Sequence, residues 1–175
     1  GMQKTEANTL EGSASIMMSR KAKEYGMYIV SGLYNWEGDT LKNVAVLYGR
    51  TGKIEGIYEK VQLPDSETEG GAVPGNKFPV FTTDFGKIGI LICWDSAFPE
   101  ISRILAINGA EILFCPVWGD VRDHDMWKLI ARARAVDNGV YFVTNIFDGH
   151  SAIVNPAGEV LQESGTQGSL LVAEI

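Results

Sequence analysis

The chain has 175 residues, 45% of them hydrophobic and 21% charged, which is typical of one globular domain and excludes extended disorder. Its 15 basic and 22 acidic residues give a net charge of −7. This argues against nucleic acid or an anionic membrane surface as the main partner, because both require an excess of Lys and Arg. No apolar run reaches the roughly 18 residues of a membrane span and no signal peptide is visible, so a cytoplasmic protein is expected.

Cys93 and Cys115 are the two cysteines, and each lies in an apolar run. A disulfide framework would need more cysteines in a smaller chain, so both thiols are expected to be reduced. Gly1 before Met2 is typical of a tag remnant. Residues 1–12 are therefore expected to be a tag remnant with a loose lead-in, followed by one domain over residues 13–175.

The first half of the chain predicts, in order, a helix, a buried strand, a hairpin and a long loop, at residues 13–25, 27–33, 44–58 and 59–77. Ser13 and Ser15 are candidate N-caps of the helix, and Gly26 is its C-terminal stop. Gly52 lies in the turn between the two β-rich runs of the hairpin.

The second half predicts strands that alternate with helices. These are a hairpin over 78–93, a helix over 99–108, a strand over 111–116, a helix from Asp123 or Asp125 to Asp137, a strand over 140–145, a hairpin over 151–162 and a last strand over 170–175. Pro99 fits the first position of its helix. The run 88–92 is apolar on both faces and belongs in the middle of a sheet. Because hairpins outnumber crossovers, the pattern predicts an α/β protein with a mixed sheet and helices packed on it.

Cys93 closes the apolar run 88–92 and precedes the turn into the helix at Pro99. Open α/β sheets place their sites at the carboxyl ends of strands, and the next backbone N–H can point at an oxyanion. A thiol there is a sensible nucleophile if a base or cation lowers its pKa. The alternative is a buried structural cysteine, which is the role expected for Cys115.

The two histidines do not indicate a catalytic base. His124 lies among acidic residues before a helix, where a capping or surface role is expected, and His150 lies in a turn. Two histidines without Cys partners give no metal-binding spacing, so no metal site is predicted.

Four segments carry short motifs in a fixed order. Residues 58–63 read Tyr-Glu-Lys-Val-Gln-Leu, and residues 89–95 read Gly-Ile-Leu-Ile-Cys-Trp-Asp, followed by Phe-Pro-Glu at 98–100. Residues 133–138 read Ala-Arg-Ala-Val-Asp-Asn, with a tyrosine at 141, and Gly-x-Ser and Asn-Pro-x-Gly follow at 149–158. Together they resemble the catalytic-lysine segment, the nucleophile segment, a helix end and the closing hairpin of the nitrilase–amidase family of carbon–nitrogen hydrolases.

The resemblance implies a four-layer α-β-β-α sandwich, usually formed by pairing sheets between subunits, and therefore a homodimer or larger assembly. It implies hydrolysis of a non-peptide C–N bond in a small-molecule amide, carbamoyl compound or nitrile. Amides and carbamoyl compounds are favoured because they are the commoner use of the fold. No metal or organic cofactor is implied.

Roles follow by matching positions to the family's motifs. Cys93 would attack the carbonyl carbon and form an acyl-thioester. Lys60 would stabilise the oxyanion and help to hold the thiolate, and the N–H of Trp94 would be a second oxyanion donor. Without the resemblance, Lys60 would be expected to be a solvated lysine at the end of a hairpin.

Four further residues are candidates for the pocket. The family's second glutamate would be Glu67 or Glu69, between which the sequence does not choose, and either could be a solvated loop acid. Trp118 and Asn145 lie at the ends of predicted strands beside Cys93 and are expected to line the pocket. The alternatives are packing for Trp118 and a turn hydrogen bond for Asn145.

The amino end departs from the family pattern. Family domains begin with a strand–helix–strand unit that ends in the catalytic glutamate, and such a unit takes roughly 30 residues. Residues 1–12 are too few, and neither Glu6 nor Glu11 follows an apolar strand, so the general base is assigned to no residue. Gln62 and Asp137 are milder departures, for His and Glu. Two functions therefore stay open: a Cys-dependent hydrolase, or a catalytically impaired remnant that serves as a binding or assembly module.

Overall fold

The structure is a computed structural model, and it describes residues 9–118, 124–147, 150–165 and 169–175. The predicted tag remnant and most of the lead-in lie outside the described residues, as do Asp123, Gly149 and the side chain of His124. No helix in the described part of the chain is long and apolar enough to cross a membrane. The chain divides into two compact units, Gly1–Lys77 and Phe78–Ile175.

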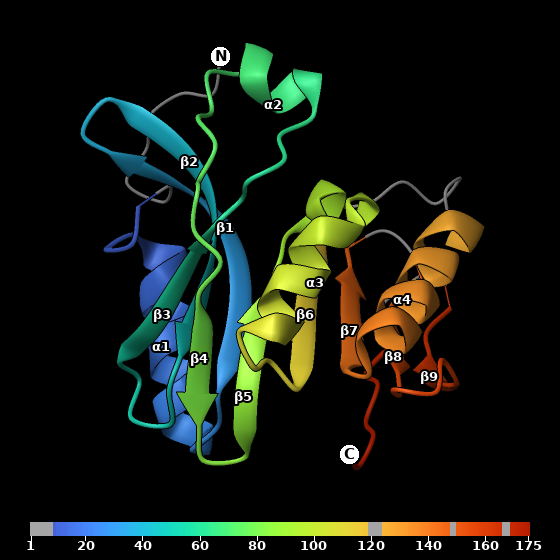
Figure 1. The fold of residues 1–175 in the computed structure, drawn as a ribbon. Coiled ribbons are helices and arrows are strands. Elements are labelled where there is room, and N and C mark those ends of the chain that lie inside the picture. Colours follow the sequence, from blue (N-terminus) through green and yellow to red (C-terminus); the bar gives the residue numbers. More distant parts are fainter. Residues whose placement is uncertain (1–8, 119–123, 148–149, 166–168) are drawn as a thin grey trace. The chain divides into compact units, whose positions relative to one another are not determined.

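The first unit is a three-stranded antiparallel sheet with a helix packed on it (Figure 1). Its elements are α1 (Ser13–Tyr25), β1 (Ile29–Glu37), β2 (Thr40–Tyr48), β3 (Ile54–Glu59) and α2 (Asp65–Glu69). The core lies between α1 and the sheet, where Ala22 of the helix packs against Val44, Val46 and Tyr48 of the central strand.

The predicted helix and hairpin of this unit are confirmed, including the stop at Gly26, which has a φ of 58°. The predicted N-caps are wrong, because Gly12 occupies that position. Ser15 lies inside the helix instead, where it is buried and its Oγ accepts a 2.9 Å hydrogen bond from the Tyr48 hydroxyl.

Two further predictions for this unit need correction. The strand predicted as buried is longer, and in β1 only Asn35 is buried, because one long edge of the strand has no neighbour within the described three-stranded sheet. The stretch predicted as one loop contains α2, which follows Pro64 and is too short to show a helical period.

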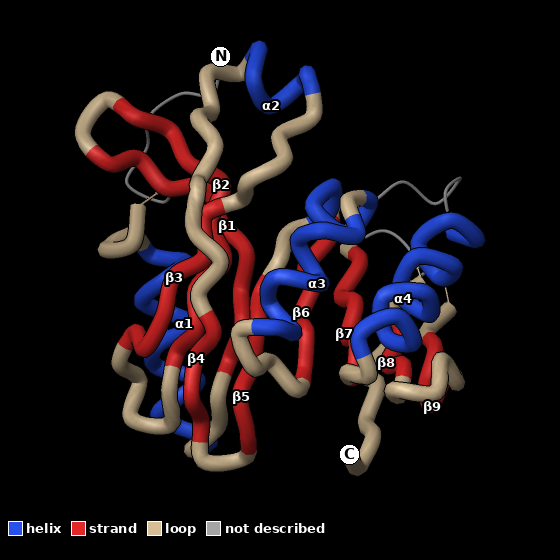
Figure 2. The backbone as a smooth tube through the Cα atoms, in the orientation of Figure 1, coloured by secondary structure: helices blue, strands red, loops and turns tan. Residues whose placement is uncertain are grey.

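The second unit is a six-stranded mixed sheet in the order β4-β5-β6-β7-β8-β9. Its elements are β4 (Val80–Thr83), β5 (Gly86–Ile90), the 3₁₀ turn η2 (Cys93–Ala97), α3 (Pro99–Ile107), β6 (Ile112–Val117), α4 (His124–Asn138), β7 (Tyr141–Ile146), β8 (Ala152–Val154) and β9 (Val160–Glu163). Strands β5, β6 and β7 are parallel, and the outer pairs are antiparallel. Figure 2 shows α3 and α4 on the same face of this sheet. The predicted mixed α/β fold is confirmed.

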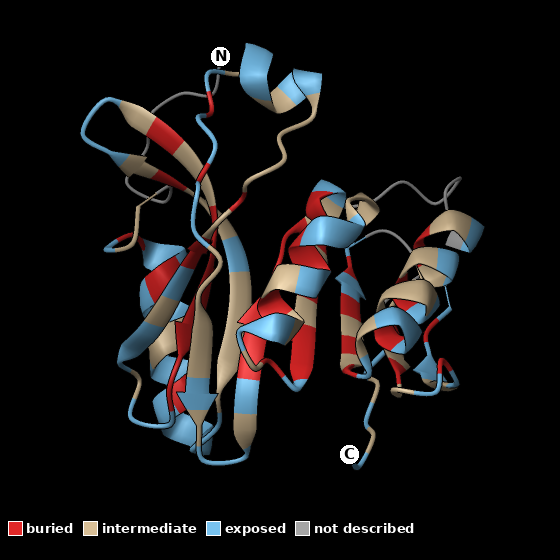
Figure 3. Cartoon of the chain, viewed as in Figure 1, coloured by how far each residue is buried: buried red, intermediate tan, exposed pale blue. Residues whose placement is uncertain are grey.

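The buried strand residues of this unit lie in β5 to β8, and Figure 3 shows red segments on β5, β6 and β7. Pro99 opens α3 as predicted. The strand predicted over 170–175 is wrong, because the described residues 169–175 contain no strand, and Leu170 and Val172 are 88% and 71% exposed. The residue types of this segment favour a strand, but a strand also needs a neighbouring strand with which to pair.

Gly89 of β5 lies where α3 approaches the sheet. A Cβ at this position would lie 2.7 Å from Leu113 Cδ2 and 3.2 Å from the Cβ atoms of Leu105 and Ala110. Gly89→Ala is therefore expected to lower the free energy of unfolding by about 1–3 kcal/mol, which is the usual cost of overpacking. Chemical denaturation would measure it, with Gly165→Ala as the control, since a Cβ at Gly165 meets nothing within 4 Å. Equal midpoints for the two variants would contradict this close approach.

Candidate active site

Cys93 lies at the carboxyl-terminal edge of the parallel strands of the second unit. β5 ends at Ile90, the chain continues beside β6 with a hydrogen bond from Leu91 N to Phe114 O (3.1 Å), and Cys93 then opens η2. Cys93 has a φ of 48° and is the one non-glycine residue with a positive φ in the described part of the chain. Such a conformation is uncommon for L-residues and costs on the order of 1–3 kcal/mol, so the surrounding structure must hold it in place.

Side chains within the turn itself provide part of that support. Asp95 is completely buried, and its Oδ2 accepts a 2.9 Å hydrogen bond from the backbone N–H of Ile92. The Ser96 hydroxyl donates to the backbone carbonyl of Cys93 at 2.8 Å. These bonds fix the backbone on both sides of Cys93, so that the direction of its Cα–Cβ bond is set before any ligand binds.

Arg134 of α4 holds the end of the same turn. Its Nε donates to the Ser96 carbonyl at 3.0 Å and its Nη2 to the Ala97 carbonyl at 3.2 Å. Asp137, one turn further along α4, lies 3.7 Å from the guanidinium. Sequence reasoning assigned no role to Asp95 or Arg134. Both lie inside the motif segments, and that position was the signal by which they could have been found.

Trp94 is the second residue of η2 and is 38% exposed. Its ring meets Phe98 edge-to-face, with centroids 6.2 Å apart. The first amides of a helix have no acceptor within that helix, so the N–H of Trp94 lies at the right point of the turn for an oxyanion donor. That role stays a prediction.

Cys115, in β6, is 1% exposed, and the expected core role is confirmed. Burial raises the pKa of the Cys115 thiol strongly, and the negative charges of a Cys93 thiolate and of Asp95 raise it further. Because the thiolate is the reactive form, Cys115 is chemically inert at neutral pH and serves as an internal reference for Cys93.

Lys60 follows β3 in the first unit, and its side chain is completely buried. The Nζ donates to Glu67 Oε1 at 2.5 Å, and the other oxygen of Glu67 accepts from Asn43 Nδ2 at 3.1 Å. The alternative of a solvated lysine is therefore wrong. Glu69, also on α2, is exposed, so Glu67 is the glutamate that contacts Lys60. Sequence reasoning missed Asn43, which lies on the neighbouring strand.

The backbone of Lys60 is fixed on both sides. Its N–H donates to the Asn43 carbonyl at 2.9 Å, and its own carbonyl accepts from the N–H of Gly75 at 2.8 Å. A buried ammonium with a fixed backbone and a carboxylate partner keeps a positive charge at a defined point, which is what stabilisation of an oxyanion requires.

Trp118 and Asn145 belong to the same sheet edge of the second unit as Cys93. Trp118 follows β6 directly, is 74% exposed and stacks on Phe147, with ring centroids 4.5 Å apart and planes 13° apart. Trp118 is thus not a core-packing residue. Asn145 is exposed and lies one residue before the end of β7. Sequence reasoning missed Phe147, because a contact between strands depends on their register.

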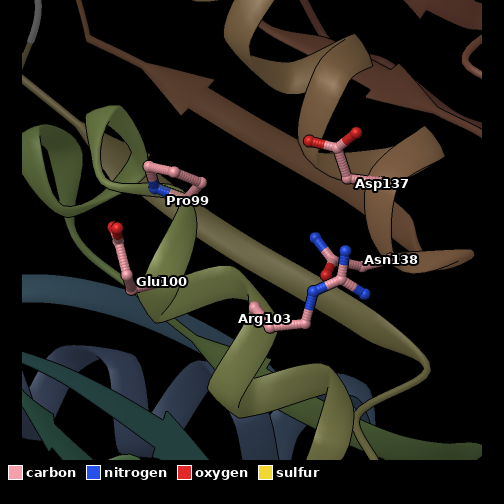
Figure 4. A pocket seen from close by; sticks show the side chains of 5 residues that line it. All are labelled: Pro99, Glu100, Arg103, Asp137 and Asn138. Carbon is pink, nitrogen blue, oxygen red and sulfur yellow. The ribbon is translucent and has the colours of Figure 1, made fainter.

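A hollow of about 220 Å³ lies between α3 and α4, lined by Pro99, Glu100, Arg103, Asp137 and Asn138 (Figure 4). None of the predicted catalytic residues lines it. Figure 4 shows the ends of the Arg103 and Asn138 side chains directed toward each other, whereas the carboxyl groups of Glu100 and Asp137 are turned away from them. No cysteine, serine or threonine is among the residues that line this hollow.

Comparison with known proteins identifies the family. The family model for carbon–nitrogen hydrolases matches residues 3–175. A probable nitrilase of Schizosaccharomyces pombe is 35% identical over 87% of this chain, and the human omega-amidase NIT2 is 30% identical over 97%. The chain spans 60% of the length of the former and 68% of the latter.

Solved structures agree with these relatives. Nit3 of Saccharomyces cerevisiae, a member of the nitrilase superfamily, has a TM-score of 0.83 and 29% identity over 93% of this chain and 65% of its own. A mutant of the Nesterenkonia sp. AN1 amidase has a TM-score of 0.79 and 30% identity over 89% of this chain and 63% of its own. That structure shows covalent addition of the acetamide moiety of fluoroacetamide at the active site cysteine. The predicted nitrilase-type fold is confirmed, and this chain belongs to the carbon–nitrogen hydrolase family of the nitrilase superfamily.

Proposed function

We propose that the chain hydrolyses the C–N bond of a small-molecule amide, with Cys93 as the nucleophile. The observation that carries the proposal is the backbone of Cys93, which is held at a positive φ at the carboxyl end of a parallel strand by the buried Asp95 and by Arg134. A structural cysteine needs no such conformation, whereas a nucleophile gains a fixed direction from it.

In the proposed reaction, Cys93 Sγ attacks the carbonyl carbon, and the carbonyl oxygen becomes an oxyanion. The Lys60 ammonium and the N–H of Trp94 stabilise this charge. The C–N bond then breaks, the amine leaves with the proton that the thiol supplied, and water hydrolyses the acyl-thioester to the acid and free thiol. These proton transfers need a general base, which we assign to no residue of the described chain.

The supporting residues have defined parts in this proposal. Glu67 positions Lys60, and its 2.5 Å contact and the exposure of Glu69 favour it over that residue. Trp118 and Asn145 line the acyl side of the pocket, at the sheet edge that carries Cys93. The proposal includes a homodimer or larger assembly and a reducing, cytoplasmic compartment, because the family's sheets usually pair between subunits and the nucleophile must stay a thiol.

Amides are favoured over nitriles by the relatives. The human relative is an omega-amidase, and a solved relative is an amidase that forms an adduct with the acetamide moiety of fluoroacetamide at its cysteine. The probable nitrilase keeps the nitrile as the second substrate to test. No observation favours the alternative of a binding or assembly module.

The test measures alkylation of Cys93 by iodoacetamide against pH, by peptide mass spectrometry, beside ammonia release from a panel of amides and nitriles. Cys93 is expected to react with a midpoint below about 8.5, the value for an unperturbed thiol, while Cys115 stays unmodified. Cys93→Ala is expected to abolish ammonia release. If Cys93 is as inert as Cys115, or if the alanine variant keeps its activity, the proposal is wrong.

A further inference from the structure

Trp118 and Phe147 leave two neighbouring parallel strands at the same edge. Val117 pairs with Ile146 at the ends of β6 and β7, and the N–H of Phe147 donates to the Val117 carbonyl at 2.9 Å. Because β5 pairs in parallel with β6, with Ile90 opposite Phe114, Cys93 leaves β5 at that same edge. The thiol and the two rings therefore share one edge of one sheet.

The two rings form a preformed apolar surface. They are nearly parallel with centroids 4.5 Å apart, and Trp118 and Phe147 are 74% and 71% exposed. Mutual stacking fixes the orientation of both side chains, so that little side-chain conformational entropy is lost when a ligand binds to them. Single exposed apolar residues are ordinary, but two large rings stacked in solvent beside a nucleophile are typical of a binding surface.

The charges at this edge select among ligands. In the segments 91–98, 118 and 145–147, all of them described, there is no Lys or Arg, and Asp95 supplies the one formal charge. Within these segments a substrate carboxylate would find no cation, and an apolar ring would find two aromatic faces. The two cations nearest in this proposal are already engaged, because Lys60 is paired with Glu67 and proposed for the oxyanion, and Arg134 is bonded to the Ser96 and Ala97 carbonyls. Dicarboxylic monoamides, such as succinamic acid, therefore fit this edge poorly.

We propose that Trp118 and Phe147 form an aromatic platform for the acyl group of the substrate, so that the site prefers amides of aryl and arylalkyl carboxylic acids over monoamides of dicarboxylic acids. This proposal rests on the proposed function in one respect: the amide group of the substrate is taken to lie at Cys93. The platform binds the part of the substrate that remains attached to the thiol after the amine leaves. It would therefore act on both acylation and hydrolysis of the acyl-thioester.

The test separates binding from turnover. In a Cys93→Ala background no acyl-enzyme forms, and binding of 4-fluorophenylacetamide is followed by fluorine NMR, with phenylacetamide, succinamic acid and acetamide as competitors. Trp118→Ala and Phe147→Ala are each expected to weaken binding about three- to tenfold, the usual worth of an aromatic contact. Phe85→Ala is the matched control, because Phe85 is 48% exposed but lies in the β4–β5 turn, at the opposite end of β5.

Weaker binding in the two platform variants, with unchanged binding in Phe85→Ala, supports the platform. This holds even if the wild-type chain releases no ammonia, because that result contradicts only the proposed hydrolysis. The platform is wrong if 4-fluorophenylacetamide does not bind, if succinamic acid competes as well as phenylacetamide, or if both platform variants bind like the control. With an active wild-type chain, kcat/KM for phenylacetamide should fall in the two platform variants by a larger factor than kcat/KM for acetamide, and Phe85→Ala should leave both values unchanged.

Discussion

Replacing Lys60 with methionine is expected to abolish amide hydrolysis and to lower the free energy of unfolding by about 3 kcal/mol. The change removes the cation proposed for the oxyanion, and it leaves the Glu67 carboxylate with only Asn43 as its described side-chain donor. Breaking a buried ion pair by removing one partner typically costs 3–5 kcal/mol. The lower end applies here, because the Glu67 side chain is 13% exposed and water can solvate part of its charge.

A second variant separates chemistry from stability. Lys60→Met with Glu67→Leu replaces both charges by apolar groups, so unfolding stability should recover while hydrolysis does not. Lys42→Met is the matched control, because Lys42 pairs with Glu37 and Glu59 but its side chain is 19% exposed and both partners are more exposed still. It should change stability by at most about 1 kcal/mol. Substantial activity in Lys60→Met would refute the proposed role of the lysine.

Replacing Arg134 with alanine is expected to slow both Cys93 alkylation and amide hydrolysis about tenfold or more. The guanidinium donates to the Ser96 and Ala97 carbonyls, which end the turn that Cys93 begins. Without it the strained backbone of Cys93 relaxes, and a misplacement of about 1 Å is enough to cost about a hundredfold in rate. Arg134→Lys should recover part of the rate, since one ammonium cannot replace both arms of the guanidinium.

The control for this prediction lies on the same helix. Arg132 also donates to a backbone carbonyl, that of Gly158 at 2.8 Å, which lies between β8 and β9 and not in η2. Arg132→Ala should therefore leave the alkylation rate of Cys93 unchanged. Cys115 reports on the fold, because general unfolding would expose it to the reagent. Slow Cys93 alkylation with Cys115 still protected identifies a local effect, and an unchanged Cys93 rate in Arg134→Ala would contradict the positioning role.

The sequence predicted the elements whose signals are local. The helical period predicted α1, and the glycine after it predicted where α1 ends. The apolar run before Cys93 predicted a buried strand. Local rules failed where a tertiary partner decides. Ser15 has the residue type of an N-cap, but Tyr48 holds it inside the helix. The segment 170–175 has the residue types of a strand, but it pairs with no strand in the described chain.

The same division holds at the site. Cys93 was predictable because a strand end followed by a turn and a helix is a sequence pattern. The choice between Glu67 and Glu69 was not, because two residues along a helix point about 200° apart and only the fold shows which side meets Lys60. Phe147 could not be found either, since its contact with Trp118 follows from the register of β6 and β7.

The left-handed backbone of Cys93 has an evolutionary consequence. A positive φ is a position where stability alone favours glycine, which adopts it without steric cost. A cysteine there stores conformational energy that mutation would readily release, in the way that active sites often trade stability for activity. Once selection for chemistry ceased, drift toward glycine would stabilise the fold. A cysteine at this position is therefore expected where selection for the thiol continues.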